Sequence, residues 1–522
     1  MKEAIEEAIV RKAKAVLRKQ RIKDATKLKH AERFQKRTGT PAGRPVLQEP
    51  RWWQFHPHFD PRYCLTHAKF LARVIWQKLQ EGSYEPVPAV KFDVEKPDGS
   101  LRPIMAFSIP DAAVANVFHR AITARNINLF SSYSYAYRPD KNVFDAILHL
   151  NRSLSHPKSY IVQYDFSKYF DTIDHSYLEK LISNQNLFLL TSAERTAIRA
   201  FLIHRYAHVN NYKAEGWEQR VKGVPQGCSL SLFLSNAAAH ELDLALERQN
   251  GTFVRFADDV VAVTHTYTDA RNVALQFRAH CNVAGIRINF NKSPGILLFD
   301  NGIERDERTF FIDSDDGGDI GTIDGFEYLG HRLSGSGITI STRARKRIKR
   351  KISEIIHKHL FLYRRGAGGA LNLDRVGEGF HDWDLVTCLN EIRRYLYGGL
   401  RERQISDFLI NEGKLPFVRG LMAFYPLVSD ANPLMELDGW LENVLTRAVR
   451  ERRRVLKQYG FDQKPLTREQ IRTGSWYDYS KVYNDSRLPS FTRAWRAARK
   501  YYLRYGLRNI EAPSYYSLLS LY

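Results

Sequence analysis

Two adjacent aspartates, Asp258 and Asp259, stand inside an otherwise apolar segment of the chain. Phenylalanine and valine dominate on both sides of them, at Phe253, Val254, Phe256, Val260, Val261 and Val263. This pattern predicts a β-hairpin over residues 253–263 with the two acids at its tip. Adjacent carboxylates in an apolar hairpin repel each other and lose hydration, and bound cations would offset that cost. The segment therefore predicts a cation site rather than an ordinary surface turn.

A third aspartate, Asp165, lies near the end of a second apolar run. Residues 159–166 read Ser-Tyr-Ile-Val-Gln-Tyr-Asp-Phe, which predicts a buried strand. An acid at a strand end that faces two acids at a hairpin tip supplies the hard oxygen ligands that Mg²⁺ prefers. Two such ions, roughly 4 Å apart, stabilise the attacking and leaving oxygens of phosphoryl transfer. We therefore expect a two-metal site for nucleotidyl transfer.

The expected ligands are the three carboxylates and one carbonyl. Asp165 and Asp258 would hold both ions, which are Mg²⁺ or, as an alternative, Mn²⁺. Asp259 would support them less directly, and the backbone carbonyl of Phe166 would add a ligand. The three aspartates are accordingly the predicted catalytic residues.

Flanking segments carry clear secondary-structure signals. Residues 91–104 predict a hairpin around Pro97-Asp98-Gly99. A helix is predicted from Ile109 to about Ala124, opened by Pro110 and Asp111. Apolar periodicity predicts further helices over residues 176–184, 229–248 and about 343–351, and a mostly helical region from about residue 384 onward.

The chain is strongly basic, with a formal net charge of +22 over 522 residues. Polyanion binding is the usual physical reason for such an excess, so nucleic acid is the expected partner. Lysine and arginine are dense in residues 1–45, where one or two helices are expected before a linker at 38–45. This segment is either an arm on RNA or DNA or a helix that packs on the body of the protein.

The sequence gives no sign of a membrane or secreted protein. No apolar run reaches the roughly 18 residues that span a bilayer, and the start Met1-Lys2-Glu3 leads into no apolar signal core. The cysteines form no Cys-x-x-Cys pair; they are Cys64, Cys228, Cys281 and Cys388. We therefore expect a cytoplasmic protein without a zinc module or a disulfide framework.

Several segments resemble, in order, the motifs of the reverse transcriptase family. Tyr164–Phe170 resembles motif A, and Phe256–Asp259 resembles the Tyr-x-Asp-Asp box of motif C. The other matches are Gly223–Ser229 to motif B, Asn289–Ser293 to motif D, Phe326–Gly330 to motif E and Ser134–Pro139 to a fingers motif of bacterial members. The resemblance runs from about residue 88 to 335. It implies an RNA-directed DNA polymerase with an RNA template, dNTP substrates and a DNA product.

The resemblance also implies a fold: α+β, of the right-hand polymerase type. We assign residues 1–50 to a basic N-terminal helical extension, 51–158 to the fingers and 159–335 to the palm with the catalytic aspartates. Residues 336–383 would form a basic thumb-like segment, and 384–522 a mostly α-helical C-terminal domain.

The family's nucleotide-binding positions carry over residue by residue. Phe170, in motif A, would stack under the incoming sugar and disfavour a 2′-hydroxyl, while Gln226 would lie near the nascent base pair. Arg102 and Lys96 would hold the triphosphate, because a planar guanidinium suits phosphate oxygens. Lys292 would neutralise or protonate the leaving pyrophosphate. A core ring at position 170 and a solvated lysine at position 96 are the structural alternatives.

Two departures from the family pattern bear on the subfamily. The motif C box begins with Phe256 rather than tyrosine, which should alter primer handling or fidelity. After Gly227 the sequence Cys-Ser-Leu-Ser-Leu is closer to abortive-infection and defence-associated enzymes than to the Ser-Pro of group II intron proteins. That likeness implies antiphage (antiviral) defence, a dedicated noncoding RNA template, a homo-oligomer and protein-primed synthesis. The candidate priming residues are Tyr515, Tyr516 and Tyr522.

Alternatives to the defence assignment stay open. An intron maturase without an endonuclease needs only a basic thumb and a maturase region. A retron enzyme is a further alternative, although Val263-Thr264-His265 lacks the glycine of the retron signature. The tail tyrosines are otherwise explained by helix packing, by an oligomer interface or by stacking on bases. A polymerase-like fold that binds RNA without turnover is disfavoured by the intact carboxylate triad.

Overall fold

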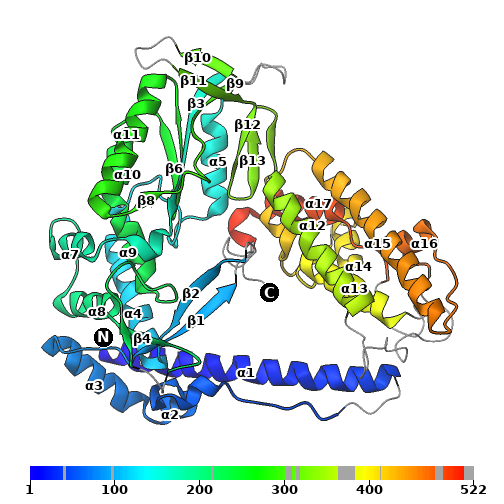
Figure 1. The fold of residues 1–522 in the computed structure, drawn as a ribbon, viewed down its shortest axis with the longest axis horizontal. Coiled ribbons are helices and arrows are strands. Elements are labelled where there is room, and N and C mark those ends of the chain that lie inside the picture. The colour runs from blue at the N-terminus through cyan, green and yellow to red at the C-terminus, as the bar shows by residue number, and fades with distance from the viewer. Residues whose placement is uncertain are drawn as a thin grey trace. The chain divides into compact units, whose positions relative to one another are not determined.

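The computed structural model in Figure 1 describes residues 1–38, 43–95, 99–212, 216–300, 309–312, 318–362, 382–411, 413–476 and 486–510. The chain divides into two compact units. Unit 1 is Met1–Lys29 with Pro45–Ile323, and unit 2 is His30–Arg44 with Asp324–Tyr522. No helix of the described residues is both long and apolar enough to cross a membrane.

A mostly antiparallel sheet forms the centre of unit 1. Its strands run in the order β10-β11-β9-β3-β7-β6, and β3 also pairs with β8. Their bounds are Lys158–Ser167 (β3), Thr252–Phe256 (β6), Asp259–Thr264 (β7), Arg287–Ile288 (β8), Gly295–Asp300 (β9), Thr309–Ile312 (β10) and Gly318–Ile323 (β11). The strand predicted over 159–166 is thus β3, and the hairpin predicted over 253–263 is β6–β7. Both predictions are confirmed.

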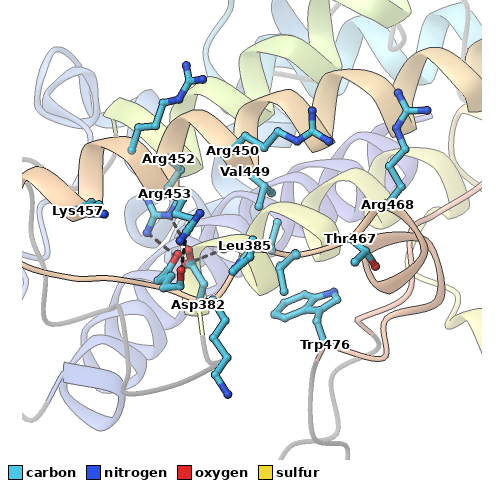
Figure 2. A pocket seen from close by; sticks show the side chains of 15 residues that line it. Asp382, Leu385, Val449, Arg450, Arg452, Arg453, Lys457, Thr467, Arg468 and Trp476 are labelled. Atoms are coloured by element: carbon cyan, nitrogen blue, oxygen red, sulfur yellow. Dashed lines mark hydrogen bonds and ion pairs between the residues drawn. The ribbon is translucent and has the colours of Figure 1, made fainter.

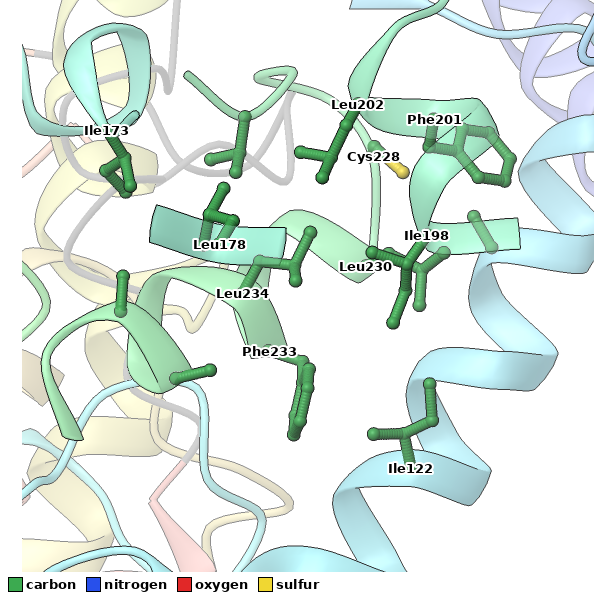
Figure 3. Close-up of a cluster of buried hydrophobic side chains, with 14 of the residues drawn as sticks. Ile122, Ile173, Leu178, Ile198, Phe201, Leu202, Cys228, Leu230, Phe233 and Leu234 are labelled. Carbon is green, nitrogen blue, oxygen red and sulfur yellow. The ribbon is translucent and has the colours of Figure 1, made fainter. Parts of the chain in front are cut away.

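Helices cover this sheet and build the core of unit 1. Helix α11 (Tyr267–Ala284) contacts β3, β7 and β9, while α5 (Val143–Ser153) contacts β6. Figure 3 shows part of the core that the helices enclose, where Ile122, Leu178, Ile198 and Phe233 come together. They come from α4 (Ile109–Asn126), α7 (His175–Ser183), α8 (Ser192–Leu202) and α9 (Leu230–Ala238). Each buried side chain of this size stabilises the fold by roughly 1.5–3 kcal/mol.

The helix predicted over 229–248 is wrong in one respect, because the segment forms two helices. They are α9 and α10 (His240–Glu247), which are separated at Ala239. No proline or glycine marks the break in the sequence. Asn236 before the break and Asp243 after it both bond to Arg255, so we attribute the break to these tertiary contacts.

The fingers hairpin is confirmed as β1 (Ala89–Glu95) and β2 (Leu101–Ala106). It belongs to a sheet of order β2-β1-β4-β5, in which β4 (Arg205–His208) runs parallel to β1 and β5 (Glu218–Gln219) pairs with β4. The predicted helix from Ile109 is confirmed as α4, and its N-cap is Ser108. Shorter helices of this part are α2 (Pro61–Thr66), α3 (Ala68–Glu81) and α6 (Tyr169–Thr172).

The basic N-terminal segment is a single helix, α1 (Lys2–Thr38). Its first turns bury Ile5, Ala8, Ile9 and Ala13 in the core cluster of unit 1. These positions repeat at helical spacing and form one apolar stripe. At least the first part of α1 therefore packs on the body of the protein rather than standing free as an arm.

Asp111 near the start of α4 gives unit 1 a specific dependence on pH. Its carboxylate is buried and accepts hydrogen bonds from the Tyr84 hydroxyl (2.7 Å), the Ser108 hydroxyl (2.6 Å) and the Val87 amide (3.0 Å). Burial nevertheless raises the pKa of Asp111 to about 6. An acid whose pKa is higher in the folded chain favours the fold while protonated, so its contribution falls as the pH rises from about 4 to about 6.

We expect Asp111→Asn to remove this dependence. The free energy of unfolding of the wild type, relative to the variant, should fall by on the order of 3 kcal/mol between pH 4 and pH 7. Urea unfolding at several pH values measures the difference. A difference that does not change with pH would contradict the prediction.

Unit 2 contains a small sheet and a set of helices. The sheet has the order β12-β13-β14, with bounds Gly325–Tyr328, His331–Ser334 and Gly337–Ile340. The predicted basic helix is α12 (Thr342–His357), which buries Ile348, Ile352, Ile355 and Ile356. The remaining helices are α13 (Trp383–Tyr397), α14 (Glu402–Ile410), α15 (Asn432–Gln458), α16 (Arg468–Thr473) and α17 (Phe491–Tyr505). The α+β class and the helical C-terminal region are confirmed, whereas the domain boundaries drawn from the sequence stay predictions.

Candidate active site

The tip of the β6–β7 hairpin brings two of the three predicted aspartates next to the third. Asp258 lies in the turn, and Asp259 is the first residue of β7, directly opposite Asp165 on β3. Directly opposed residues of an antiparallel pair lie on the same face of the sheet. The turn is tight, because Ala257 adopts a left-handed backbone with φ of 62°. The Phe166 amide donates to the Asp258 carbonyl at 3.4 Å and ties the turn to β3.

The carboxylates of Asp165 and Asp258 lie close enough at this hairpin tip to repel each other. Burial, and then the nearby Asp165 carboxylate, raise the pKa of Asp258 to about 6. Lys292 and Arg102 act in the opposite direction and lower that pKa. The Lys292 ammonium lies 3.4 Å from Oδ2 of Asp165. Two carboxylates and two cationic side chains from separate segments therefore share one electrostatic site.

The segment around Lys292 is fixed to the end of β3. The Asn289 amide donates to the Asp165 carbonyl at 2.8 Å, and the Asp165 amide donates to Oγ of Ser293 at 2.9 Å. Lys292 itself is 58% exposed, so its ammonium can meet a bound substrate. The predicted motif D residue is thus placed beside the aspartates.

The donor set fits a hard divalent cation. Asp165 and Asp258 interact closely enough to disfavour the second negative charge, and a bound cation removes that penalty. No group of three or more His, Cys, Asp or Glu side chains among the described residues has the geometry of a metal site. Mg²⁺ is commonly held by one or two carboxylates together with substrate phosphates and waters, so two converging carboxylates suffice.

The loop of motif B is fastened to the segment that carries Phe170. The Val224 amide donates to the Phe170 carbonyl at 2.6 Å, and a Cβ at Gly223 would overlap that same carbonyl oxygen. Only glycine permits this approach, with φ of 72° at Gly223. The Gln226 side chain donates to Oδ2 of Asp171 at 3.0 Å, and the Gln226 carbonyl accepts from the Met105 amide of β2 at 2.8 Å.

Phe170 is half-buried, and its ring meets Tyr137 edge to face at 6.2 Å between centroids. Arg102 is half-buried on β2. Of the other predicted positions, Lys96 and the candidate priming residues Tyr515, Tyr516 and Tyr522 lie outside the described residues.

A buried ion pair supports the turn from behind. Arg255 is 0% exposed and makes a two-pronged salt bridge to Asp243, at 2.7 and 2.6 Å. The same guanidinium donates to the Ala257 carbonyl and to Oδ1 of Asn236, both at 3.1 Å, and to the Ser134 hydroxyl at 2.7 Å. Arg255 thereby joins the fingers motif, the α9–α10 break and the residue before Asp258.

Sequence reasoning missed this network and the one around Asp171. Arg220 donates to Oδ1 of Asp171 at 3.3 Å and Gln226 donates to Oδ2, so each oxygen of that carboxylate accepts a hydrogen bond. Asp243 carries no local signal, because its partner is set by the fold. Arg255 did carry one, since a charged residue within an apolar strand predicts a buried partner.

The comparisons with known proteins agree with this geometry. Residues 94–333 match the family model described as reverse transcriptase (RNA-dependent DNA polymerase). Protein YkfC of Escherichia coli strain K12 is 26% identical over 181 residues, which are 34% of this chain and 45% of that protein. An uncharacterized 91 kDa protein in the cob intron of Schizosaccharomyces pombe is 25% identical over 179 residues, which are 34% of this chain and 21% of that protein. The chain thus spans less than half the length of these relatives.

Solved structures of telomerases are similar to part of the chain. Telomerase from Candida albicans, in complex with a fragment of telomeric RNA, aligns with a TM-score of 0.38 at 12% identity, over 76% of this chain and 67% of that one. Apo telomerase from Candida tropicalis aligns with a TM-score of 0.35 at 11% identity, over 56% of each chain. The family match and the palm geometry confirm the right-hand polymerase fold. Residues 94–333 form a reverse transcriptase family domain.

Proposed function

We propose that this protein is an RNA-directed DNA polymerase that adds dNTPs to a DNA strand with the help of two divalent metal ions. One observation carries the proposal: Asp165 and Asp258 converge within a reverse transcriptase family domain, where burial and then the Asp165 carboxylate raise the pKa of Asp258. A carboxylate pair that disfavours its own charge is poised for cations. Lys292 and Arg102 offset only part of that cost, because the pKa of Asp258 stays raised.

The roles of the residues follow from their places. Asp165 and Asp258, supported by Asp259 and the Phe166 carbonyl, would hold the ions. Bound divalent ions would neutralise charge on the attacking and leaving oxygens of phosphoryl transfer. Arg102 and Lys292, whose charges already act on Asp258, would bind the triphosphate and the leaving pyrophosphate.

The direct test is dNTP incorporation by the purified full chain. The assay supplies an RNA template with an annealed DNA primer and Mg²⁺ or Mn²⁺, and a parallel reaction replaces the RNA with DNA of the same sequence. We expect RNA-templated extension that chelation of the metal abolishes. Failure to extend any primer on either template, by a protein that binds the RNA, would contradict the proposal.

Phe170 would select the sugar of the incoming nucleotide. The Val224 amide fixes the backbone of Phe170, and the ring meets Tyr137 edge to face, so a shift of the ring away from a 2′-hydroxyl would lose that contact. We expect Phe170→Ala to raise rNTP incorporation relative to dNTP by about tenfold or more, the effect of about 1.4 kcal/mol. Phe70→Ala, at an exposed phenylalanine of α3, is the matched control. Unchanged dNTP/rNTP selectivity in the Phe170 variant would exclude this role.

The biological setting that the sequence favours is antiphage defence in the bacterial cytoplasm. The support is the sequence that follows Gln226 and the helical region from α13 onward. In this setting a dedicated noncoding RNA serves as template and the enzyme acts as a homo-oligomer. Expression in a bacterial host should reduce phage plaques, and Asp258→Asn should abolish that protection. Equal protection by both proteins would contradict a role of DNA synthesis in defence.

DNA synthesis in this setting would start on the protein itself. A tyrosyl hydroxyl can attack the α-phosphate in place of a primer 3′-hydroxyl, and Tyr515, Tyr516 and Tyr522 are the candidates. Incubation with labelled dNTP and without primer should leave label on the protein in a denaturing gel, sensitive to protease. Absence of label from the protein band would exclude protein priming.

A second candidate function is that of an intron-encoded reverse transcriptase and maturase. One relative is described as a protein in the cob intron, and the net charge of +22 suits RNA binding. Sequencing the RNA that co-purifies with the protein separates the candidates. Intron RNA would favour the maturase, and a short noncoding RNA would favour defence.

A further inference from the structure

A cavity in unit 2 lies far along the chain from the catalytic aspartates. It lies between α15, the start of α13 and the segment 463–468, and its volume is about 600 Å³. This volume falls in the range of roughly 300–1,000 Å³ typical of ligand sites. Figure 2 shows Leu385, Val449 and Trp476 around the cavity, with a series of arginines along α15.

The lining is strongly cationic. Its basic members are Arg450, Arg452, Arg453, Arg454, Lys457, Lys464 and Arg468. Asp382 is the one acid among the described residues that line the cavity, and Arg452 occupies both of its oxygens at 2.6 and 3.2 Å. The lining therefore keeps a net positive charge, which favours an anionic ligand.

The charge on α15 is concentrated on one helical face. Arg450, Arg453, Arg454 and Lys457 follow the spacing i, i+3, i+4, i+7, at which like charges repel and destabilise a helix. Glu451 pairs with Arg454 and Asp462 with Arg453. Within the described part of the chain, no carboxylate pairs with Arg450 or Lys457. The repulsion is relieved when a polyanion binds along this face.

The other wall suits a base rather than a bare phosphate. Leu385, Val449, Pro465, Leu466 and Trp476 contribute apolar surface next to the cations. Aromatic rings beside a positively charged groove are the usual way in which proteins hold single-stranded nucleic acid without reading its sequence. The axial rise from Arg450 to Lys457 is about 10 Å, which is long enough to meet more than one phosphate.

We propose that this cavity binds a nucleotide of a single-stranded RNA, with the base against the apolar wall at Trp476 and the phosphates along the cationic face of α15. The site is separate from the polymerase site and does not rest on the proposed activity. It would hold RNA through residues of unit 2 alone, without the catalytic aspartates of unit 1.

Photocross-linking of the full-length protein tests the proposal. A 4-thiouridine oligouridylate is irradiated with the protein, and the cross-linked peptides are identified by mass spectrometry. We expect cross-links in the segments around 463–468 and Trp476. Asp258→Asn should give the same cross-links, which distinguishes this site from the polymerase site. Absence of label from these peptides, with label elsewhere on the protein, would overturn the proposal.

Two variants on one helix provide a matched comparison. Arg450 and Arg447 are both exposed on α15, but Arg447 does not line the cavity. We expect Arg450→Glu to reduce the cross-link at Trp476 by about tenfold, because a phosphate contact is replaced by repulsion, and Arg447→Glu to leave it unchanged. Equal loss in both variants would show a non-specific basic surface instead and would overturn the proposal.

Salt dependence and competition complete the test. Arg450→Glu with Lys457→Glu should lower the slope of log affinity against log salt by about 1.4, because each phosphate contact on a single strand contributes about 0.7. In separate cross-linking reactions, oligodeoxythymidylate competes with the RNA, or 8-azido-ATP replaces the RNA as the photoreactive label. Labelling of the same peptides by 8-azido-ATP alone would support the nucleotide chemistry and make a free nucleotide its source. An unchanged salt slope would count against phosphate contacts at these residues.

Discussion

Asp258→Asn should abolish RNA-templated dNTP incorporation while the protein stays folded. Asparagine has nearly the shape of aspartate, so the turn after Ala257 is retained, but the charge that would hold the metal ions is lost. Loss of about 4 kcal/mol of transition-state stabilisation corresponds to a thousandfold in rate. We therefore expect activity to fall at least about a thousandfold in a primer-extension assay, with RNA binding nearly unchanged.

The stability of this variant should change in the opposite direction. At pH 7.5 and without divalent ions, the wild type carries an ionised Asp258 whose pKa is raised to about 6 by burial and by Asp165. The ionised form opposes folding above that pH, so the thermal midpoint of Asp258→Asn should be higher than that of the wild type. Mg²⁺ should raise the midpoint of the wild type alone, because a ligand stabilises only the state that binds it.

A surface aspartate provides the control for these measurements. Asp324 is 65% exposed in an ion pair with Arg332. Asp324→Asn should keep full activity, a stability within about 1 kcal/mol of the wild type and an unchanged response to Mg²⁺. Retained synthesis in Asp258→Asn would exclude the assignment of the catalytic carboxylates.

Local sequence patterns predicted the parts of the site that depend on local structure. Apolar residues on both sides of Asp258 and Asp259 predicted a hairpin, and the apolar run before Asp165 predicted a strand. The structure pairs those elements in register, with Asp165 opposite Asp259. The acids stand out because carboxylates within apolar strands are costly without a ligand. Patterns of this kind carry information over only a few residues.

Features that depend on distant partners were not predictable in the same way. Strand β4 pairs in parallel with β1 although more than a hundred residues separate them, and its four residues carry too little pattern to predict a strand. The break at Ala239 has no proline or glycine to announce it. Asp243 reads as a surface residue of a helix until the fold places Arg255 beside it. Tertiary contacts, rather than propensity, decide each of these features.

The buried pair of Arg255 and Asp243 leads to the second large effect. Both side chains are fully buried, so removal of one leaves the other charged or unpaired in the core. We expect Arg255→Met to lower the free energy of unfolding by about 3–5 kcal/mol, the usual cost of breaking a buried ion pair. Arg199→Met, in an ion pair with Glu179 that is roughly half exposed, should cost at most about 1 kcal/mol.

A double variant separates the stability of the core from the position of the turn. Arg255→Met with Asp243→Leu removes both charges, and replacement of a whole buried pair by apolar residues is often neutral. We expect most of the lost stability to return in chemical unfolding. Activity should not return, because the Ala257 carbonyl, one residue before Asp258, still lacks the guanidinium that holds it at 3.1 Å. Recovery of full dNTP incorporation together with stability would show that the pair serves the core alone, and that the turn keeps its geometry without Arg255.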